Sequence, residues 1–260
     1  MKKMVRRPIP ILAVALATSL AAAACGSDNA APSTPTAVTS SVVPSGAEST
    51  TEPGSTDAGS TDAGSTTDAV TPIPADEVQA AIETIPVSGL TPAEREGLLH
   101  MREEEKLALD VYQALYERWP LPVFDNIAAA EATHTASVKV LLDRYGLADP
   151  AAGRAAGSFE SQEMQALYDA LVAQGSGSLV DALTVGATIE DLDIADLRAR
   201  ATDTPDIALV YANLERGSRN HLRAFSAQLE GQGAGYTPLH ITQSDYDAIV
   251  AGAIERGPAA

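Results

Sequence analysis

Six acidic or imidazole side chains occupy, or lie beside, positions at which an amphipathic helix would carry apolar residues. They are Glu105, Glu131, His134, Glu190, Asp193 and His221. Five continue the three- and four-residue steps of an apolar stripe, and Asp193 lies one turn from Glu190. Carboxylate oxygens and imidazole nitrogens together suit iron, manganese or, less specifically, zinc. The pattern therefore predicts a metal site, mononuclear or dinuclear, inside a helical protein.

Burying these groups requires compensation. One unpaired buried carboxylate costs several kcal/mol, and several of them together also repel one another, so they must be neutralised or bind cations. Taken singly, Glu105 could mark the edge of a buried face, and His134 could be a hydrogen-bonded core histidine. Because all four long helices carry such an interruption, a shared metal site is the favoured interpretation.

Four long helices are expected to carry these residues. They are predicted over 92–119, 125–145, 179–200 and 205–230. The first opens with a capping box, Thr91-Pro92-Ala93-Glu94, and we expect Asp125 to cap the second and Ser178 the third. Shorter helices are predicted over 161–174 and 244–255, with a weaker one over 75–83.

The connections between these helices predict the topology. Short loops make the first pair and the second pair antiparallel neighbours, and about 30 residues containing one small helix separate the pairs. We therefore predict an all-α, ferritin-like four-helix bundle with one long crossover and a short C-terminal helix. At about 1.5 Å per residue, the polar interruptions lie within roughly 15 Å of one level.

The other titratable residues singled out in the sequence are not expected to be metal ligands. Glu103 and Glu104 are expected to be solvated, with Glu104 the one able to turn inward. His100 and His240 are expected at the surface. Tyr112 and Tyr211 are expected in the core, although a tyrosine beside a metal can also serve redox chemistry.

Several motifs resemble known metal-binding helices. Glu105-Lys-Leu-Ala108, followed by Tyr112, resembles the first-helix ligand motif of ferritins and rubrerythrins, and Glu131-Ala-Thr-His134 resembles their second-helix Glu-x-x-His. Residues 101–119, 126–147, 178–197 and 213–225 together resemble the ferritin-like domain family catalogued as domain of unknown function 2202. The resemblance covers about residues 85–250 and implies a ferritin-like fold with a dinuclear metal centre, but no settled activity.

The fourth long helix departs from the ferritin-like pattern. It carries Ser218-Arg219-Asn220-His221, where a second Glu-x-x-His is usual, so one bridging glutamate is missing. Two metals remain an option if Asp193 contributes, and a single metal or an asymmetric pair are the others. The chain also lacks the cysteine set of a rubrerythrin-type electron relay.

The first 25 residues have the form of an export signal. A basic start precedes an apolar stretch over 11–24 that is too short to span a membrane comfortably. The ending Ala22-Ala23-Ala24-Cys25-Gly26 resembles a bacterial lipoprotein cleavage box, in which the cysteine is acylated. We predict anchoring through Cys25 to the outer face of the bacterial cytoplasmic membrane; plain secretion with a chance cysteine is the alternative.

Composition divides the remainder and limits its partners. Residues 26–74 are rich in Ser, Thr, Pro and Gly and are predicted to be a disordered tether, with the helical domain over 75–260. Cys25 is the only cysteine, so the domain has no disulfide. A net charge of −18 and a pI near 4.4 argue against nucleic acid as a partner.

Two functions follow as hypotheses. The first is an extracytoplasmic metal-binding protein with an iron or manganese centre and an oxidase, peroxide-scavenging or metal-capture role. The alternative is a non-enzymatic interaction module of the cell envelope that lacks a working centre. A hydrolase finds little support, since no nucleophile elbow or zinc-hydrolase motif is present. A homodimer is one option for the assembly.

Overall fold

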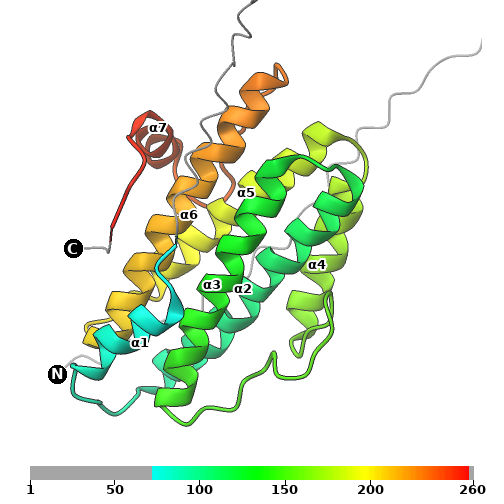
Figure 1. Cartoon of the computed structure of the whole chain (residues 1–260). Helices are drawn as coiled ribbons and strands as arrows, with labels where there is room; N and C mark the ends of the chain where they lie inside the picture. Colours follow the sequence, from blue (N-terminus) through cyan, green and yellow to red (C-terminus); the bar gives the residue numbers. More distant parts are fainter. Residues whose placement is uncertain (1–71, 258–260) are drawn as a thin grey trace, which may run out of the picture. The chain divides into compact units, whose positions relative to one another are not determined.

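The computed structural model describes residues 72–257, which form seven α-helices and no strand (Figure 1). The helices are α1 (Ala75–Glu83), α2 (Pro92–Arg118), α3 (Pro122–Arg144), α4 (Gln162–Gly175), α5 (Leu179–Ala199), α6 (Pro205–Gly231) and α7 (Gln243–Ala251). This confirms the predicted all-α fold. The predicted signal peptide, Cys25 and residues 26–71 of the predicted tether lie outside the described residues.

The helix ends agree with the local sequence, with two exceptions. The capping box is present: the Thr91 hydroxyl accepts the Glu94 N–H at 3.2 Å, and Glu94 accepts the Thr91 N–H at 2.8 Å. Asp125 does not cap α3, because the helix starts earlier, at Pro122, where proline needs no N–H partner. Asp125 instead lies in the first turn, where its negative charge interacts favourably with the positive end of the helix dipole. The last helix ends at Ala251 rather than 255, because Gly252 turns to an extended conformation.

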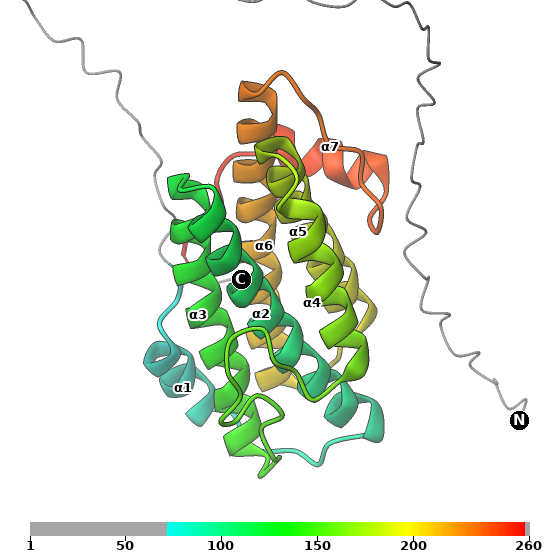
Figure 2. The ribbon, with the colours of Figure 1, turned by 90° about the vertical axis from the view of Figure 1, so that its right-hand side faces the viewer.

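Two antiparallel pairs build the bundle. α2 pairs with α3 and α5 with α6, and the chain crosses from the end of α3 to the start of α5 through α4 (Figures 1 and 2). α4 packs on α2 and α5, while α1 covers the seam between α3 and α6. This is the predicted topology of two hairpins joined by one long crossover. No helix within 72–257 is both long and apolar enough to cross a bilayer.

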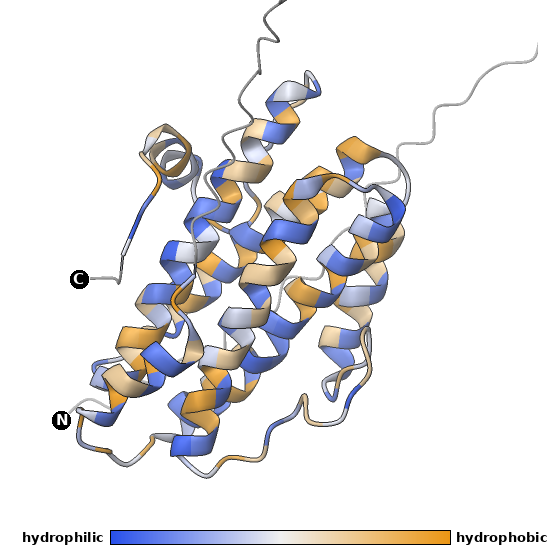
Figure 3. Ribbon diagram, in the orientation of Figure 1, coloured by the Kyte–Doolittle hydropathy of each residue, from blue (hydrophilic) through white to orange (hydrophobic). Residues whose placement is uncertain are grey.

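The core consists of two apolar clusters separated by a polar layer. The Phe225 cluster includes Leu107, Val111, Leu115, Phe124, Leu183 and Phe225. The Leu141 cluster includes Leu98, Met101, Val138, Leu141, Leu197, Val210 and Leu214. Figure 3 shows hydrophilic turns interrupting the hydrophobic ones along the long helices. Each long helix thus contributes to both clusters, and on α2, α3 and α6 the polar interruption lies between the residues of one cluster and those of the other.

Candidate metal centre

The structure buries all six predicted ligand residues in the polar layer between the two clusters. Their exposed fractions run from 2 % for Glu105, Glu131 and Glu190 to 8 % for His221. The residues come from α2, α3, α5 and α6, so the interruptions predicted on four separate helices meet at one level.

Glu131 lies between the two histidines. Its Oε2 is 2.9 Å from His134 Nδ1, and its Oε1 is 2.8 Å from His221 Nδ1. The two imidazole rings stack with centroids 5.4 Å apart. Each of these three residues offers a ligand atom within 4.8 Å of the others. One carboxylate therefore faces two imidazoles that approach from neighbouring helices.

A second carboxylate faces each histidine. Glu105 Oε2 lies 3.4 Å from His134 Nδ1, and Glu190 Oε2 lies 3.4 Å from His221 Nδ1. Each Nδ1 atom thus meets Glu131 and one further glutamate. The arrangement has an approximate twofold character, with Glu131 shared between the halves.

Asp193 lies on the far side of the same layer. It accepts a short hydrogen bond from the Ser218 hydroxyl, and its Oδ1 has no hydrogen-bond partner. A small internal cavity is lined by five carboxylate residues together with Ala108 and Ile189. The carboxylates belong to Glu104, Glu105, Glu131, Glu190 and Asp193. Asp193 therefore reaches the cavity but not the histidine pair.

The structure corrects the expectation for Glu103 and Glu104. Neither is solvated: Glu103 is 6 % exposed and accepts the N–H groups of Glu160 and Ser161 at the start of α4. Glu104 is 2 % exposed and faces the cavity. Both are buried because the crossover and α5 cover faces of α2 that look polar in the sequence. Three consecutive glutamates span most of a helical turn, so a covered helix could not leave them all in solvent.

His100 is partly exposed, at 29 %, and it has two acidic neighbours that the sequence did not predict. Its Nε2 lies 2.8 Å from Asp196 Oδ2 on α5 and 3.2 Å from Glu104 Oε2. His240 is exposed, as predicted. The spacing of His100 and Glu104 at i, i+4 was the available signal, but only the packing of α5 supplies Asp196.

Burial and mutual charge set the protonation of the layer. Desolvation raises the pKa of Glu105 to about 8 and, with the nearby Glu105 charge, raises that of Asp193 well above its usual range. Burial alone would lower the pKa of His221, but Glu190 and Glu131 raise it to about 9. Desolvation opposes the ionisation of Glu131, yet the two histidines hold its pKa well below normal.

The donor set fits a metal ion. Among the six predicted ligand residues, three buried atoms have no hydrogen-bond partner: Glu105 Oε1, Asp193 Oδ1 and His221 Nδ1. His221 Nδ1 is close to Glu131 and Glu190, but the geometry of these contacts is not that of a hydrogen bond. Leaving such atoms unsatisfied is costly, and a cation bound by oxygen and nitrogen would satisfy them.

Neighbouring residues hold the ligands in place. Tyr112, fully buried, donates its hydroxyl to Glu190 Oε1 at 2.5 Å. Gly217 on α6 makes room for the His134 ring, since an added Cβ would lie 2.4 Å from His134 Cε1 and 2.5 Å from Nε2. A glycine is therefore required where α6 passes that imidazole.

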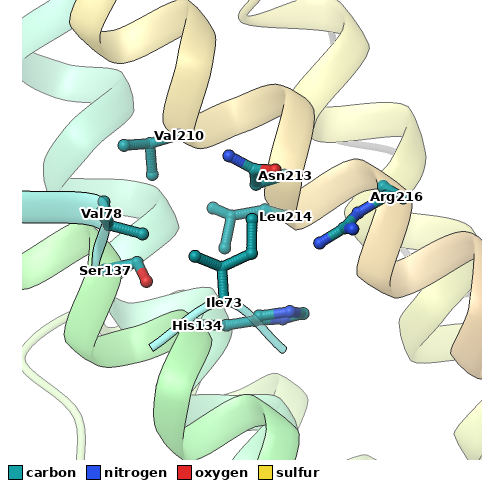
Figure 4. A pocket seen from close by; sticks show the side chains of 8 residues that line it. All are labelled: Ile73, Val78, His134, Ser137, Val210, Asn213, Leu214 and Arg216. Carbon is teal, nitrogen blue, oxygen red and sulfur yellow. The ribbon is translucent and has the colours of Figure 1, made fainter. Parts of the chain in front are cut away.

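A pocket leads toward His134 from outside the bundle. Figure 4 shows its lining, which comes from α1 and the segment before it, from α3 and from α6. The lining residues are Ile73, Val78, His134, Ser137, Val210, Asn213, Leu214 and Arg216. Ile73 packs partly buried against the Leu141 cluster. The α1 segment therefore closes the α3–α6 seam above this histidine.

Comparison with known proteins identifies the family of the chain and a solved structure of similar fold. Residues 94–253 match the family described as "Uncharacterized protein domain (DUF2202)", and the chain belongs to that family. It is 49 % identical over 178 residues to the uncharacterized protein MJ0754 of Methanocaldococcus jannaschii, covering 68 % of this chain and 96 % of that protein. A crystal structure of hypothetical protein MJ0754 from Methanococcus jannaschii superposes with a TM-score of 0.65 at 48 % identity. The superposition covers 66 % of this chain and 99 % of the chain in that crystal structure. The predicted resemblance to this family is confirmed.

Proposed function

We propose that this chain is an extracytoplasmic, ferritin-like metal-binding protein with an iron or manganese centre in its polar layer. The observation that carries the proposal is Glu131, which faces both His134 and His221 inside a layer that leaves buried ligand atoms unpaired. The proposed ligands are Glu105, Glu131, His134, Glu190 and His221, with Asp193 as a sixth.

The residues divide into two half-sites. His134 and Glu105 would hold one metal position, His221 and Glu190 the other, and Glu131 would bridge them. This symmetry supports a dinuclear centre, and a single ion held by Glu131, His134 and His221 is the other arrangement that the ligand positions allow. Ser218 replaces the usual glutamate of α6 and binds Asp193 instead, so Asp193 supplies oxygen where α6 does not.

The surroundings favour redox chemistry or metal capture. Bound iron or manganese supplies electron exchange with dioxygen or peroxide. The two apolar clusters exclude bulk water from the layer, and Tyr112 holds Glu190 through a hydrogen bond. Oxidase, peroxide-scavenging and metal-capture roles all use this arrangement, and they differ in whether an oxidant consumes electrons from the centre.

The location proposed for the domain rests on sequence. An export signal over 1–25, a lipid anchor on Cys25 and a tether over 26–74 would hold the domain outside the bacterial cytoplasmic membrane. Substitution Cys25→Ser tests this in the producing cell. We expect it to move the chain from the membrane fraction to the soluble exported fraction, and unchanged fractionation would contradict the anchor.

An alternative is an interaction module that kept the bundle and lost the metal. The serine at position 218 favours it, because one bridging ligand of the ferritin-like pattern is absent. Under this alternative, Glu105→Ala and Glu131→Ala would stabilise the domain and leave nothing bound. Under the metal proposal, chelation lowers the Tm of the wild type.

Metal analysis tests the proposal. The purified full-length chain is reconstituted anaerobically with Fe²⁺ or with Mn²⁺, desalted, and its metal content and absorption spectrum are measured. We expect one or two equivalents in the core centre, and these are lost in Glu131→Ala and kept in Glu117→Ala, which changes an exposed glutamate on α2. A wild-type chain that retains no metal contradicts the proposal.

A further inference from the structure

A second cluster of ligand residues lies at the α2–α5 seam, outside the core centre. His100, Glu104 and Asp196 offer ligand atoms within 4.8 Å of one another. The side chains of His100 and Asp196 are 29 % and 28 % exposed, whereas Glu104 is buried. One imidazole and one carboxylate therefore face solvent, and the third group faces inward.

An ordinary ion pair accounts for part of this cluster only. His100 Nε2 and Asp196 Oδ2 are 2.8 Å apart, and Arg200 also lies 3.6 Å from that oxygen. Asp196 is thus well compensated. Glu104 is less well compensated: both of its oxygens are buried, its Oε2 lies 3.2 Å from His100 Nε2 without forming a hydrogen bond, and its Oε1 has no hydrogen-bond partner. A carboxylate that is 2 % exposed and accepts no hydrogen bond points to a ligand that the ion pair does not supply.

Glu104 also belongs to the wall of the core cavity. The cavity that Glu105, Glu131, Glu190 and Asp193 line includes Glu104 on its α2 side. The same carboxylate is 3.2 Å from His100 on the other side. Glu104 therefore connects the partly exposed cluster with the buried centre, and carboxylates continue from one to the other.

We propose that His100, Glu104 and Asp196 form a second, partly exposed site for a divalent transition-metal ion, and that metal reaches the core centre through it. One imidazole and two carboxylates suit Mn²⁺, Fe²⁺, Co²⁺ or Zn²⁺. The two exposed ligands receive the ion from solvent, and Glu104 passes it toward Glu105 and Asp193. The binding site stands by itself; the route rests on the proposed core centre.

Co²⁺ binding to the full-length chain tests the proposal. Equilibrium dialysis gives the stoichiometry, and visible absorption follows the time course of loading. We expect His100→Ala to lose one equivalent of Co²⁺, because its affinity at the second site falls at least about tenfold. We also expect the core of this variant to fill at least about tenfold more slowly. Asp196→Asn, which keeps the side-chain shape, should show the same pattern. His240→Ala, which removes an exposed histidine, should behave as the wild type.

A core variant separates this proposal from the proposed function. Glu131→Ala combined with His221→Ala should keep the one equivalent at the second site, and His100→Ala added to it should remove that equivalent. If the core variant binds no Co²⁺, the second site is wrong. If His100→Ala and Asp196→Asn bind less metal but load the core at the wild-type rate, the route is wrong. If the wild type binds a single equivalent that only the His100 and Asp196 variants lose, the core centre fails and the second site stands.

Discussion

Asp191 and Glu105 are both buried carboxylates of the bundle, and their oxygens have different surroundings. Asp191 is 0 % exposed and accepts the Tyr236 hydroxyl at 2.8 Å and the N–H groups of Leu239, His240 and Ile241 at 2.5–2.9 Å. Glu105 has one oxygen 3.4 Å from His134 and another with no hydrogen-bond partner. The first carboxylate holds the segment before α7 against α5, and the second faces a cavity.

The contrast separates structural burial from functional burial. A carboxylate with a full set of hydrogen bonds stabilises the native state by itself, whereas an incompletely paired one destabilises it until a cation binds. Asp191 therefore serves as an internal reference for a buried carboxylate whose hydrogen bonds are complete. We expect the two regions to respond in opposite ways when their carboxylates are replaced.

The largest effect is expected from Asp191→Ala. It leaves three backbone N–H groups and a tyrosine hydroxyl without their acceptor, and we expect a loss of about 3–5 kcal/mol in the free energy of unfolding. Urea unfolding of the metal-free chain measures it, with the exposed Asp247→Ala as control. Metal content of the folded variant should be unchanged. A loss of metal with little loss of stability would reverse the comparison.

Gly217→Ala should disturb the centre through packing. The added Cβ overlaps the His134 ring, so we expect a cost of about 1–3 kcal/mol and metal binding weakened about tenfold. Gly231→Ala, at the end of the same helix with open space around its Cβ, should be neutral or slightly stabilising. Equal behaviour of the two variants in a metal titration would mean that the His134 ring position is unimportant.

Glu105→Gln should have the opposite sign to Asp191→Ala in the metal-free protein. The folded-state pKa of Glu105 is about 8 against an ordinary value of 4.5, so the folded state binds the extra proton. Its contribution to stability therefore falls as pH rises from 4.5 to about 8. Glutamine removes this dependence. We expect the apo variant to be more stable than the wild type at pH 8–9 by up to about 1 kcal/mol, with weaker metal binding. A destabilised apo variant at pH 9 would contradict the account.

Tyr112→Phe should have the smallest effect on the stability of the metal-free protein. It removes the 2.5 Å hydrogen bond to Glu190 while keeping the ring in the core. We expect metal affinity to fall about tenfold, because groups that orient a ligand usually contribute that much. Tyr211→Phe is the matched control, since Tyr211 is also a buried tyrosine. Unchanged affinity in Tyr112→Phe would mean that Glu190 needs no support.

Local patterns predicted most of the helices and part of the site. The capping box at Thr91 and the i, i+3 spacing of Glu131 and His134 lie within one turn, so the sequence displays them directly. The α3 start at Pro122 was missed because Asp125 is a better cap by residue type than Leu121, the observed N-cap, whose side chain makes no capping hydrogen bond.

Contacts between helices that are distant in the sequence were harder to predict. The segment over 190–193 contains three acids with three destinations: Glu190 faces His221, Asp191 binds the residues before α7, and Asp193 binds Ser218. Their residue types do not distinguish these roles. The sequence did not predict the contact of His100 and Glu104 with Asp196, because only the packing of α5 on α2 brings the three side chains together.

Anomalous diffraction from crystals of the chain grown with Mn²⁺ tests the central claim most directly. The account predicts a manganese peak within coordinating distance of Glu131, His134 and His221, with Asp191 free of metal. A density map with no peak beside Glu131 at saturating Mn²⁺, while the side chains keep their places, would contradict it.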